Sequence, residues 1–361
     1  MILAVPDYYE QFVCTSSACR DNCCRGGWQI DVDPDTVNLY RTVGGNMGER
    51  LVGAVQTDIE GGCFLAQPEG RCPFLLSDGL CEIHRDMGPD YLCVVCRQFP
   101  RFSEYYGATK ESGLGLSCEE AARIILSKTT PLTIVEKELD EEEYEDSEFD
   151  AEICNTLKRA RDIFFDWIGD SGLSGDAVLI RMLWSADCIQ EYINSDDREG
   201  LSAYVDGGMA VDSDISKSAM LSEQEYADAY DCIWAVYREQ ESLGSVWDEC
   251  AEAVSARVLP ACSIGRYSKC FDRIEYRNLM EYFVYRYFLK ASYDYDVIGK
   301  IRFAVSALLI IRDMEAVLGD LGETVHIFSK QFEYLSDGVG DLIEDFMFED
   351  VFETEVLASV I

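Results

Sequence analysis

Cysteine is the residue type whose number and spacing in this chain point most directly to chemistry. The sequence contains 16 cysteines in 361 residues, and ten of them lie within the first 118 residues. Thiolates bind zinc and iron–sulfur clusters, form disulfides, or act as redox groups. In a reducing cytosol, grouped thiols more often indicate a metal site than a disulfide or redox site, or a scatter of small core residues. We therefore expect a metal site in the amino-terminal third.

The first group of thiols has the spacing Cys-x4-Cys-x3-Cys-Cys and comprises Cys14, Cys19, Cys23 and Cys24. Small residues separate these cysteines and two glycines follow them, so the backbone can fold back and turn several sulfurs toward one centre. Adjacent residues project in different directions from a regular backbone, so Cys23 and Cys24 are not expected to share one small tetrahedral site. Either two metals share the region or one of the pair is structural.

The second group is Cys72 and Cys81, which flank a Ser-Asp-Gly turn and predict a short β-hairpin. The two turn lengths that we consider pair Cys81 with Leu76 or with Phe74. Both partners are an even number of residues from Cys72, so both registers place the two thiols on one face of the hairpin. His84 follows the hairpin as a possible ligand, although a lone histidine at a strand end is more often a surface or hydrogen-bonded residue.

The third group contains the Cys-x2-Cys pair Cys93 and Cys96, followed later by Cys118. The pair has a spacing common in metal and redox sites. Ser117 and Glu120 match a capping box, which predicts that Cys118 lies in the first turn of a helix that ends near residue 128. The amino terminus of a helix stabilises a thiolate, so this position favours both ligation and reactivity.

Taken in order, these motifs resemble the flagellin lysine N-methylase family, part of a wider group of cysteine-cluster proteins with a zinc- or iron-chelating domain. The resemblance rests on SACRDNCC at residues 17–24 with Trp28 after it, CPFL at 72–75, C-x-I-H at 81–84, C-x-x-F-P-R at 96–101 and Ser-Cys at 117–118. Residues 276–288 also resemble the carboxy-terminal helical part of that family.

The resemblance implies an enzyme that carries an iron–sulfur cluster and methylates lysine side chains of flagellin with S-adenosylmethionine. A 4Fe–4S cluster is the cofactor that we expect, with zinc as the alternative, and flagellin is the expected protein partner. The metal ligands implied by the resemblance come from eight matching cysteines: Cys14, Cys19, Cys23, Cys24, Cys72, Cys81, Cys96 and Cys118. Cys63 and Cys93 fall outside that pattern.

Two familiar signatures of methyl-transfer enzymes are missing from the sequence. No strand leads into a Gly-x-Gly-x-x-Gly motif, and no Cys-x3-Cys-x2-Cys triplet is present. The sequence therefore reveals no S-adenosylmethionine site and no catalytic base. Two alternatives stay open: a zinc- or iron-binding protein without catalysis, and a thiol or iron–sulfur redox protein that uses Cys93 and Cys96.

The elements that must position these thiols differ between the two halves of the chain. From about residue 153 onward, apolar residues recur every three or four positions, which predicts amphipathic helices. We expect a mainly α protein, in which a helical bundle carries an irregular cysteine-rich module with a short β-hairpin. The predicted units are a metal or iron–sulfur module at 1–130, an acidic linker at 131–152, where acidic residues dominate, and a helical domain at 153–361.

The charge of the chain limits its partners and its location. The formal net charge is −38, and a surface of that sign repels nucleic acids and anionic lipids. The first residues lack the basic and apolar regions of a signal peptide, and the longest apolar stretch, at 304–311, is far shorter than the roughly 20 residues of a membrane span. We expect a soluble cytoplasmic protein with no nucleic-acid or membrane partner.

Overall fold

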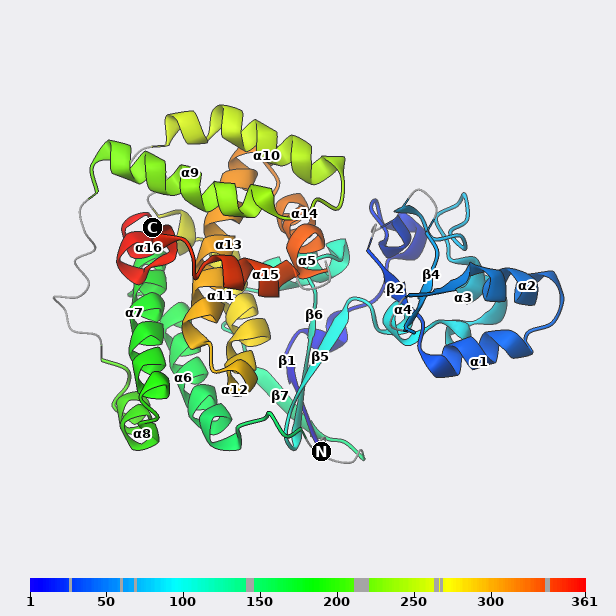
Figure 1. Ribbon diagram of the computed structural model, residues 1–361, viewed down its shortest axis with the longest axis horizontal. Helices are drawn as coiled ribbons and strands as arrows, with labels where there is room; N and C mark the ends of the chain where they lie inside the picture. Colours follow the sequence, from blue (N-terminus) through cyan, green and yellow to red (C-terminus); the bar gives the residue numbers. More distant parts are fainter. Residues whose placement is uncertain are drawn as a thin grey trace.

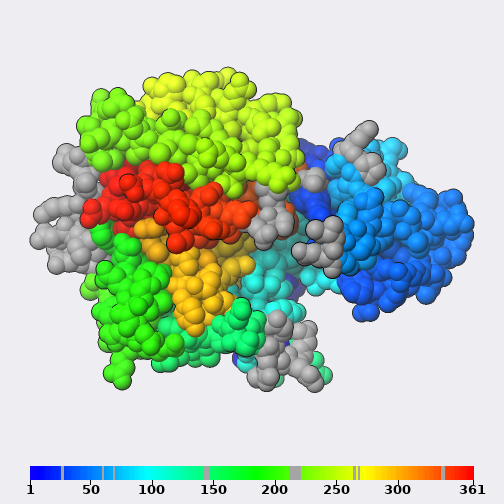
Figure 2. All heavy atoms as spheres, in the orientation of Figure 1, coloured from blue at the N-terminus to red at the C-terminus, as the bar shows by residue number. Residues whose placement is uncertain are grey.

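The chain forms a large helical body and a smaller cysteine-rich lobe beside it, which we define as residues 13–100 (Figure 1). The computed structural model describes residues 1–25, 28–58, 61–67, 70–140, 146–210, 221–262, 266, 269–334 and 338–361. In the space-filling view the lobe projects from one side of the body (Figure 2). The predicted mainly α fold is confirmed.

Helix α13 (Val297–Leu318) is the centre of the helical body. Every residue from Phe303 to Met314 is buried, and α7, α10, α11, α14 and α15 pack around the helix. A helix buried on all sides belongs to the core of a large unit. No helix in the described ranges is long and apolar enough to cross a bilayer. The other helices of the body are α5 (Glu119–Leu126), α6 (Ala151–Gly169), α7 (Gly175–Asn194), α8 (Arg198–Asp206), α9 (Glu223–Glu239), α10 (Ser245–Arg257), α11 (Ile274–Tyr287), α12 (Ala291–Asp294), α14 (Leu321–Glu333), α15 (Gly338–Asp345) and α16 (Thr354–Ser359).

A four-stranded sheet lies between the helices of the body and the cysteine-rich lobe (Figure 1). Its strand order is β5-β6-β1-β7, with β1 parallel to β6 and antiparallel to β7. The side chain of Tyr285 from α11 donates to the carbonyls of Ala4 and Ser112, and Arg161 from α6 forms a buried bidentate ion pair with Glu111. These contacts fix the sheet to the helices. The strands are β1 (Ile2–Pro6), β5 (Arg101–Tyr106), β6 (Thr109–Leu114) and β7 (Ile134–Glu138).

The acidic stretch at 131–152 contributes structure to the body on both sides of residues 141–145, which lie outside the described residues. Before them, β7 pairs with β1 along its full length, and its acidic residues lie on a sheet edge, where charge opposes pairing with a further strand. After them, the Asp150 side chain caps α6 by accepting the backbone N–H of Ile153. The predicted boundaries at 130 and 152 stay a prediction.

The cysteine-rich lobe has its own small core. Its elements are β2 (Ile30–Asp31), α1 (Pro34–Thr42), α2 (Gly45–Ala54), β3 (Val55–Thr57), β4 (Cys63–Leu65), α3 (Glu82–Met87) and α4 (Val94–Gln98), and its strands form a sheet in the order β2-β4-β3. Eleven buried residues make up this core, among them Tyr40, Phe74, Cys72 and Cys93. Residues 1–12 and 101–138 do not belong to the lobe, because Tyr8, Phe12, Tyr106 and Leu114 pack in the core of the body.

Candidate functional site

Three predicted cysteines gather around the thiol of a fourth, Cys24. Cys23 and Cys24 lie on the short 3₁₀ helix η3 (Cys23–Arg25), and the backbone N–H of Cys72 donates to the carbonyl of Cys24 at 3.0 Å. The Cys24 thiol hydrogen-bonds with the thiols of Cys23, Cys72 and Cys81. The structure therefore brings the first and second thiol groups together, although about fifty residues separate them.

The turn that carries Cys72 and Cys81 differs from the predicted hairpin in its register. Cys81 pairs through an isolated bridge with Leu75, not with Leu76 or Phe74. Leu75 is an odd number of residues from Cys72, so the predicted registers are wrong and strand alternation does not explain why the two thiols are close. Instead, the chain turns sharply after Cys72, where the backbone N–H of Leu75 donates to the carbonyl of Cys72 at 3.1 Å. This turn, not strand alternation, accompanies the approach of Cys72 to Cys81.

Hydrogen bonding within this group separates the acidities of the four thiols. Donation from Cys24 lowers the pKa of Cys81 to about 6, and it also lowers the pKa values of Cys23 and Cys72. The same bonds, together with burial, raise the pKa of Cys24 well above the usual value. The Cys24 thiol has a single proton to donate, so it stabilises a thiolate on one of these neighbours at a time, and the thiolate is the form that binds soft metals.

Cys93 and Cys96 lie next to this group. Cys93 precedes α4 as its cap residue, and hydrogen bonding between the two thiols lowers the pKa of Cys93 and raises that of Cys96. Burial, followed by the charges of Cys93, Cys96, Cys81 and Cys72, raises the pKa of Tyr40, so all four thiols lie near one buried phenol. Cys93 is not part of the family motif, although the structure places it beside the thiols around Cys24. The Cys-x2-Cys spacing of Cys93 and Cys96 is the sequence signal that could have identified it.

The remaining predicted thiols, Cys14, Cys19 and Cys118, form a second group where the lobe meets the body. Burial and then the charge of Glu119 raise the pKa of Cys19 to about 12, and its Sγ lies 3.7 Å from Glu119 Oε2. Burial raises the pKa of Cys118 to about 11, against the opposing effect of the first backbone groups of α5, and the nearby Cys14 and Cys23 thiols raise it further.

The helix that follows Cys118 begins one residue later than predicted. Cys118 is the cap residue of α5, without a side-chain hydrogen bond, and Ser117 is buried beside Tyr334. Glu120 pairs with Arg123 at 2.6 Å. The predicted capping box is therefore wrong, since Ser117 lies too deep to cap the helix.

The donor chemistry of these thiols suits zinc or an iron–sulfur cluster. Across the described ranges, however, no three His, Cys, Asp or Glu side chains are arranged to hold one metal ion. His84 is exposed, and Cys63 lies on β4, where its Sγ is 3.8 Å from the hydroxyl of Thr57. Metal binding by the eight predicted cysteines stays a prediction.

A polar and aromatic junction fixes the first thiol loop to helix α14. Asp21 lies between Cys19 and Cys23, and its Oδ2 is 2.9 Å from His326 Nε2 and 2.6 Å from Lys330 Nζ. Burial alone would raise the pKa of Asp21, but these two partners outweigh burial and lower the pKa to about 2. The ring of Tyr334 packs against Trp28 at 5.3 Å. No local pattern around His326 identified it, because its partner lies about 300 residues earlier in the chain.

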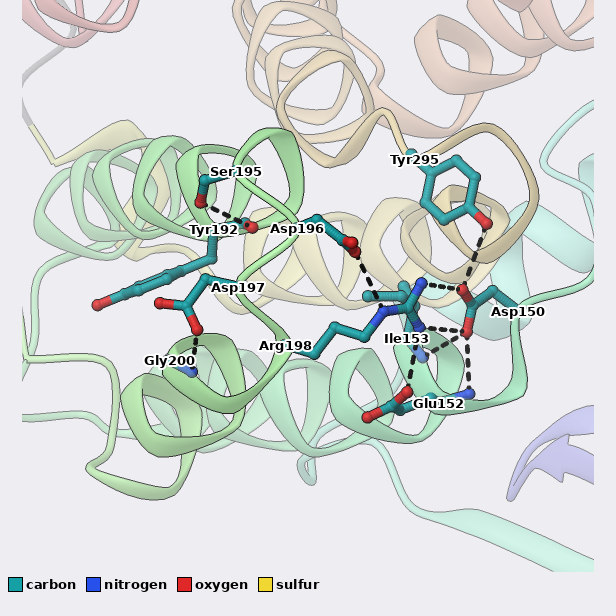
Figure 3. Close-up of polar contacts among 10 residues, drawn as sticks. All are labelled: Asp150, Glu152, Ile153, Tyr192, Ser195, Asp196, Asp197, Arg198, Gly200 and Tyr295. Atoms are coloured by element: carbon teal, nitrogen blue, oxygen red, sulfur yellow. Dashed lines mark hydrogen bonds and ion pairs between the residues drawn. The ribbon is translucent and has the colours of Figure 1, made fainter.

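The described residues form two cavities, one at the junction and one within the helical body. A cavity of about 530 Å³ lies at the junction and is lined by residues of the first thiol loop, α5 and the start of α14. A second, of about 390 Å³, lies between α6, α7 and α8, away from the thiols. In its wall Arg198 is surrounded by Asp150, Glu152 and Asp196 (Figure 3). These pairs hold the starts of α6 and α8 together, which gives the second cavity a structural explanation.

The fold and the thiol groups define a helical protein with a cysteine-rich lobe docked on it. The chain is 30% identical over 138 residues to the lysine-N-methylase of Salmonella typhimurium strain LT2. It is 31% identical over 140 residues to the lysine-N-methylase of Salmonella choleraesuis strain SC-B67. Each of these matches covers 37% of this chain and 34% of the relative. It is also 30% identical over 138 residues to the flagellar biosynthetic protein FliU of Salmonella muenchen, covering 37% of this chain and 81% of that relative.

The chain therefore belongs to the flagellin lysine N-methylase family, as the motifs predicted. The match spans about a third of the length of the curated lysine-N-methylases. No family model matches the chain, and no solved structure matches it.

Proposed function

We propose that this protein is an S-adenosylmethionine-dependent protein-lysine N-methyltransferase that acts on flagellin in the cytoplasm. The observation that carries the proposal is the similarity to two lysine-N-methylases and to the flagellar biosynthetic protein FliU. The net charge of −38 supports a lysine-bearing substrate, because it attracts cationic segments and repels nucleic acid.

Methyl transfer to lysine requires the protein to deprotonate and orient the acceptor amine. S-adenosylmethionine would supply an electrophilic methyl group. The ε-amine of a free lysine has a pKa of about 10.4 and is protonated at neutral pH, so the protein must bind the amine, remove its proton and align its lone pair. Carboxylates and neutral imidazole are the groups that commonly accept such a proton. A carboxylate, Glu119, and an imidazole, His326, both occur at the junction between the first thiol loop and the body.

We further propose that the thiols around Cys24 hold an iron–sulfur cluster, with zinc as the alternative. Cys23, Cys24, Cys72 and Cys81 would supply four sulfurs to a cluster of several irons, whereas a single zinc ion would take only one of the adjacent pair Cys23 and Cys24; Cys96 lies beside them. The support for this assignment is the mutual contact of the thiols and the low pKa of Cys81, about 6, since a ligand must be deprotonated. The role that we assign to the centre is to organise the lobe or bind substrate, because methyl transfer to an amine requires no electron transfer.

Labelled methyl transfer tests the enzymatic proposal. Full-length protein purified without oxygen is incubated with flagellin and methyl-labelled S-adenosylmethionine, and the flagellin is then analysed by mass spectrometry for methylated lysines. We expect label on lysine that depends on enzyme concentration. Repeated absence of label from protein with its full metal content would contradict the proposal.

Metal analysis of the same preparation tests the thiol centre. Broad absorption near 400 nm with bound iron and sulfide supports iron–sulfur, whereas colourless protein with bound zinc supports zinc. Cys72→Ser is expected to lower the metal content, and Cys63→Ser, outside both thiol groups, is the matched control. Metal binding without methyl transfer would favour a non-catalytic metal protein. Reversible Cys93–Cys96 oxidation without bound metal would favour a redox protein, since those two thiols already hydrogen-bond with each other.

A further inference from the structure

Two large apolar side chains are exposed side by side on the turn that follows α15. Met347 and Phe348 are 75% and 76% exposed, more than any other large apolar side chain among the described residues. Apolar residues scattered singly are ordinary on a protein surface, whereas neighbouring ones form a patch of the kind that a binding partner covers. The pair therefore marks a candidate interaction surface on the helical body.

The packing of the neighbouring residues holds this turn in place. Phe346, directly before the pair, is 2% exposed and stacks on the buried Phe352 of the 3₁₀ helix η9 (Asp350–Phe352), with ring centroids 3.9 Å apart. The backbone N–H groups of both exposed residues donate to carbonyls in the last turn of α15, each at 3.0 Å. The Asp345 carboxylate in that turn accepts from the Gln240 amide at 2.7 Å, which ties the turn to the end of α9. A partner therefore meets two side chains on a backbone that is already ordered, and binding costs little further chain entropy.

The charge around the apolar pair has one sign. From residue 341 to residue 355 the chain carries seven carboxylates and no lysine or arginine. None of the seven forms an ion pair with a described residue, although the charge of Glu353 acts on the half-buried Arg302. The acidic surface continues onto α9, where burial and then the charges of Glu349 and Asp231 raise the pKa of the Cys232 thiol. The exposed pair is thus surrounded by negative charge that the rest of the described chain leaves largely unneutralised.

This charge decides which kind of partner fits the pair. Carboxylates repel anionic lipid headgroups and nucleic acid. In a symmetric contact between two copies of this chain the same carboxylates would face each other, and each copy carries a net charge of −38. A protein segment with lysine or arginine around its apolar side chains satisfies both requirements, because it attracts the carboxylates and covers Met347 and Phe348.

We propose that Met347 and Phe348, with the carboxylates around them, form a docking surface for a cationic segment of the protein substrate. This inference rests on the proposed function, which requires a protein that presents lysine, and adds the surface that holds that protein. In Figure 2 the carboxy-terminal segment, coloured red, lies across the helical body, apart from the blue lobe that carries the thiols. Docking there holds the substrate by a segment other than the acceptor lysine, so it changes affinity and not the chemical step.

Binding of labelled flagellin without S-adenosylmethionine tests the apolar part of the surface. The double variant Met347→Ser, Phe348→Ser removes the apolar contact and keeps the charge, and its fold should persist because both side chains are exposed. We expect the Kd of the full-length protein for flagellin, measured by fluorescence anisotropy, to rise about ten-fold. The control is Val246→Ser, at a residue that is 61% exposed on α10, and it should leave the Kd unchanged. An equal Kd for the double variant and the unaltered protein would overturn the docking surface.

A second pair of variants tests the charges. Glu344→Gln with Glu349→Gln removes one exposed carboxylate on each side of the apolar pair. We expect the Kd for flagellin to rise about five-fold at low salt and by less at about 0.5 M salt, where the charges are screened. The control is Glu249→Gln with Glu252→Gln on exposed positions of α10, which changes the net charge by the same amount. If both charge variants weaken binding equally, general acidity attracts flagellin and the docking surface is refuted.

Two further measurements detect a different occupant of the pair. Sedimentation equilibrium reports self-association, and flotation with phosphatidylcholine vesicles reports binding to a neutral lipid surface. We expect neither quantity to differ between the unaltered protein and the double variant Met347→Ser, Phe348→Ser. Self-association or vesicle binding that this variant abolishes would show that a second copy or a lipid surface covers the pair, and would overturn our assignment.

Enzyme kinetics separate this proposal from the enzymatic one. If both are right, the double variant Met347→Ser, Phe348→Ser raises the KM for flagellin about ten-fold without a change in kcat, and a short peptide with one lysine is methylated as before. If the double variant methylates flagellin with the same KM as the unaltered protein, the enzymatic proposal stands and the docking surface is wrong. If flagellin binds through the apolar pair but never takes up label, the docking surface stands and the enzymatic proposal is wrong.

Discussion

The helical body and the cysteine-rich lobe reach a stable core by different means. The core of the body is built on large side chains with almost no exposure, such as Trp234, Tyr237 and Phe283, packed around α13. The core of the lobe has eleven buried residues, its strands span two or three residues, and thiols occupy its centre. A unit with so little apolar burial commonly needs cross-links or a metal. The comparison teaches that apolar packing is extensive in one part of the chain and sparse in the other, which supports the proposal that a thiol centre stabilises the lobe.

Loss of the central thiol should produce the largest effect and confine it to the lobe. Cys24→Ser removes the group that hydrogen-bonds with three other thiols, and structural metal sites contribute on the order of 10 kcal/mol to folding. We expect amides of α1, α3 and α4 to lose protection from hydrogen exchange while those of α13 keep theirs. A chelator should reproduce this pattern, and Cys232→Ser, at an exposed position of α9, should not. Protection retained throughout the lobe would remove the contrast between the two regions.

The body should instead depend on its buried packing and ion pairs. Glu111→Gln leaves Arg161 buried without its counter-charge, because both side chains are about 5% exposed and paired at 2.7 Å. Removal of one partner from such a pair costs about 3–5 kcal/mol. We expect urea denaturation followed by circular dichroism to show this loss. The control is Glu104→Gln: Glu104 lies directly opposite on β5 and pairs with Lys290 near the surface, so its loss should cost less than about 1 kcal/mol.

A buried acid gives the body a pH dependence whose sign can be predicted. Burial raises the pKa of Glu281 to about 7, although its Oε1 accepts the backbone N–H of Leu132 at 2.8 Å. In the unfolded chain the group ionises near pH 4.5. Between these two pH values the folded state holds a proton that the unfolded state has released, so its contribution to stability falls as pH rises from about 4.5 to 7.

Glu281→Gln should remove this dependence, since glutamine keeps the acceptor for Leu132 and carries no charge. We expect the variant to be more stable than the unaltered protein by about 3 kcal/mol at pH 8, with little difference at pH 4.5. Chemical denaturation at both pH values measures the change. An equal effect of the substitution at pH 4.5 and pH 8 would show that packing, not ionisation, controls this position.

The two regions also differ in how well the sequence predicts them. Helices of the body follow from apolar spacing, as in α6 and α11, because helix period and burial produce the same pattern. In the lobe the convergence of Cys72 and Cys81 on Cys24 depends on a bend between short elements, and the register derived from strand alternation is wrong by one residue. The partnership of Asp21 with His326 joins distant segments, so no local motif could reveal it.

The smallest predicted loss of stability is at the junction between the cysteine-rich lobe and the helical body. Asp21→Asn removes the charge that both His326 and Lys330 contact. Because the Asp21 side chain is 38% exposed, solvent screens the pairs and the cost should be about 1 kcal/mol. Asp31→Asn in the same lobe is the control, since asparagine still accepts from the Gln29 amide. The readout is the coincidence of urea unfolding followed by hydrogen exchange of the lobe amides and by far-ultraviolet circular dichroism. If Asp21 holds the lobe on the body, the lobe transition should move to lower urea in Asp21→Asn while the helical transition stays in place. If both transitions shift together, the lobe and the body unfold as one cooperative unit. That result would contradict the view that the two regions are stabilised independently.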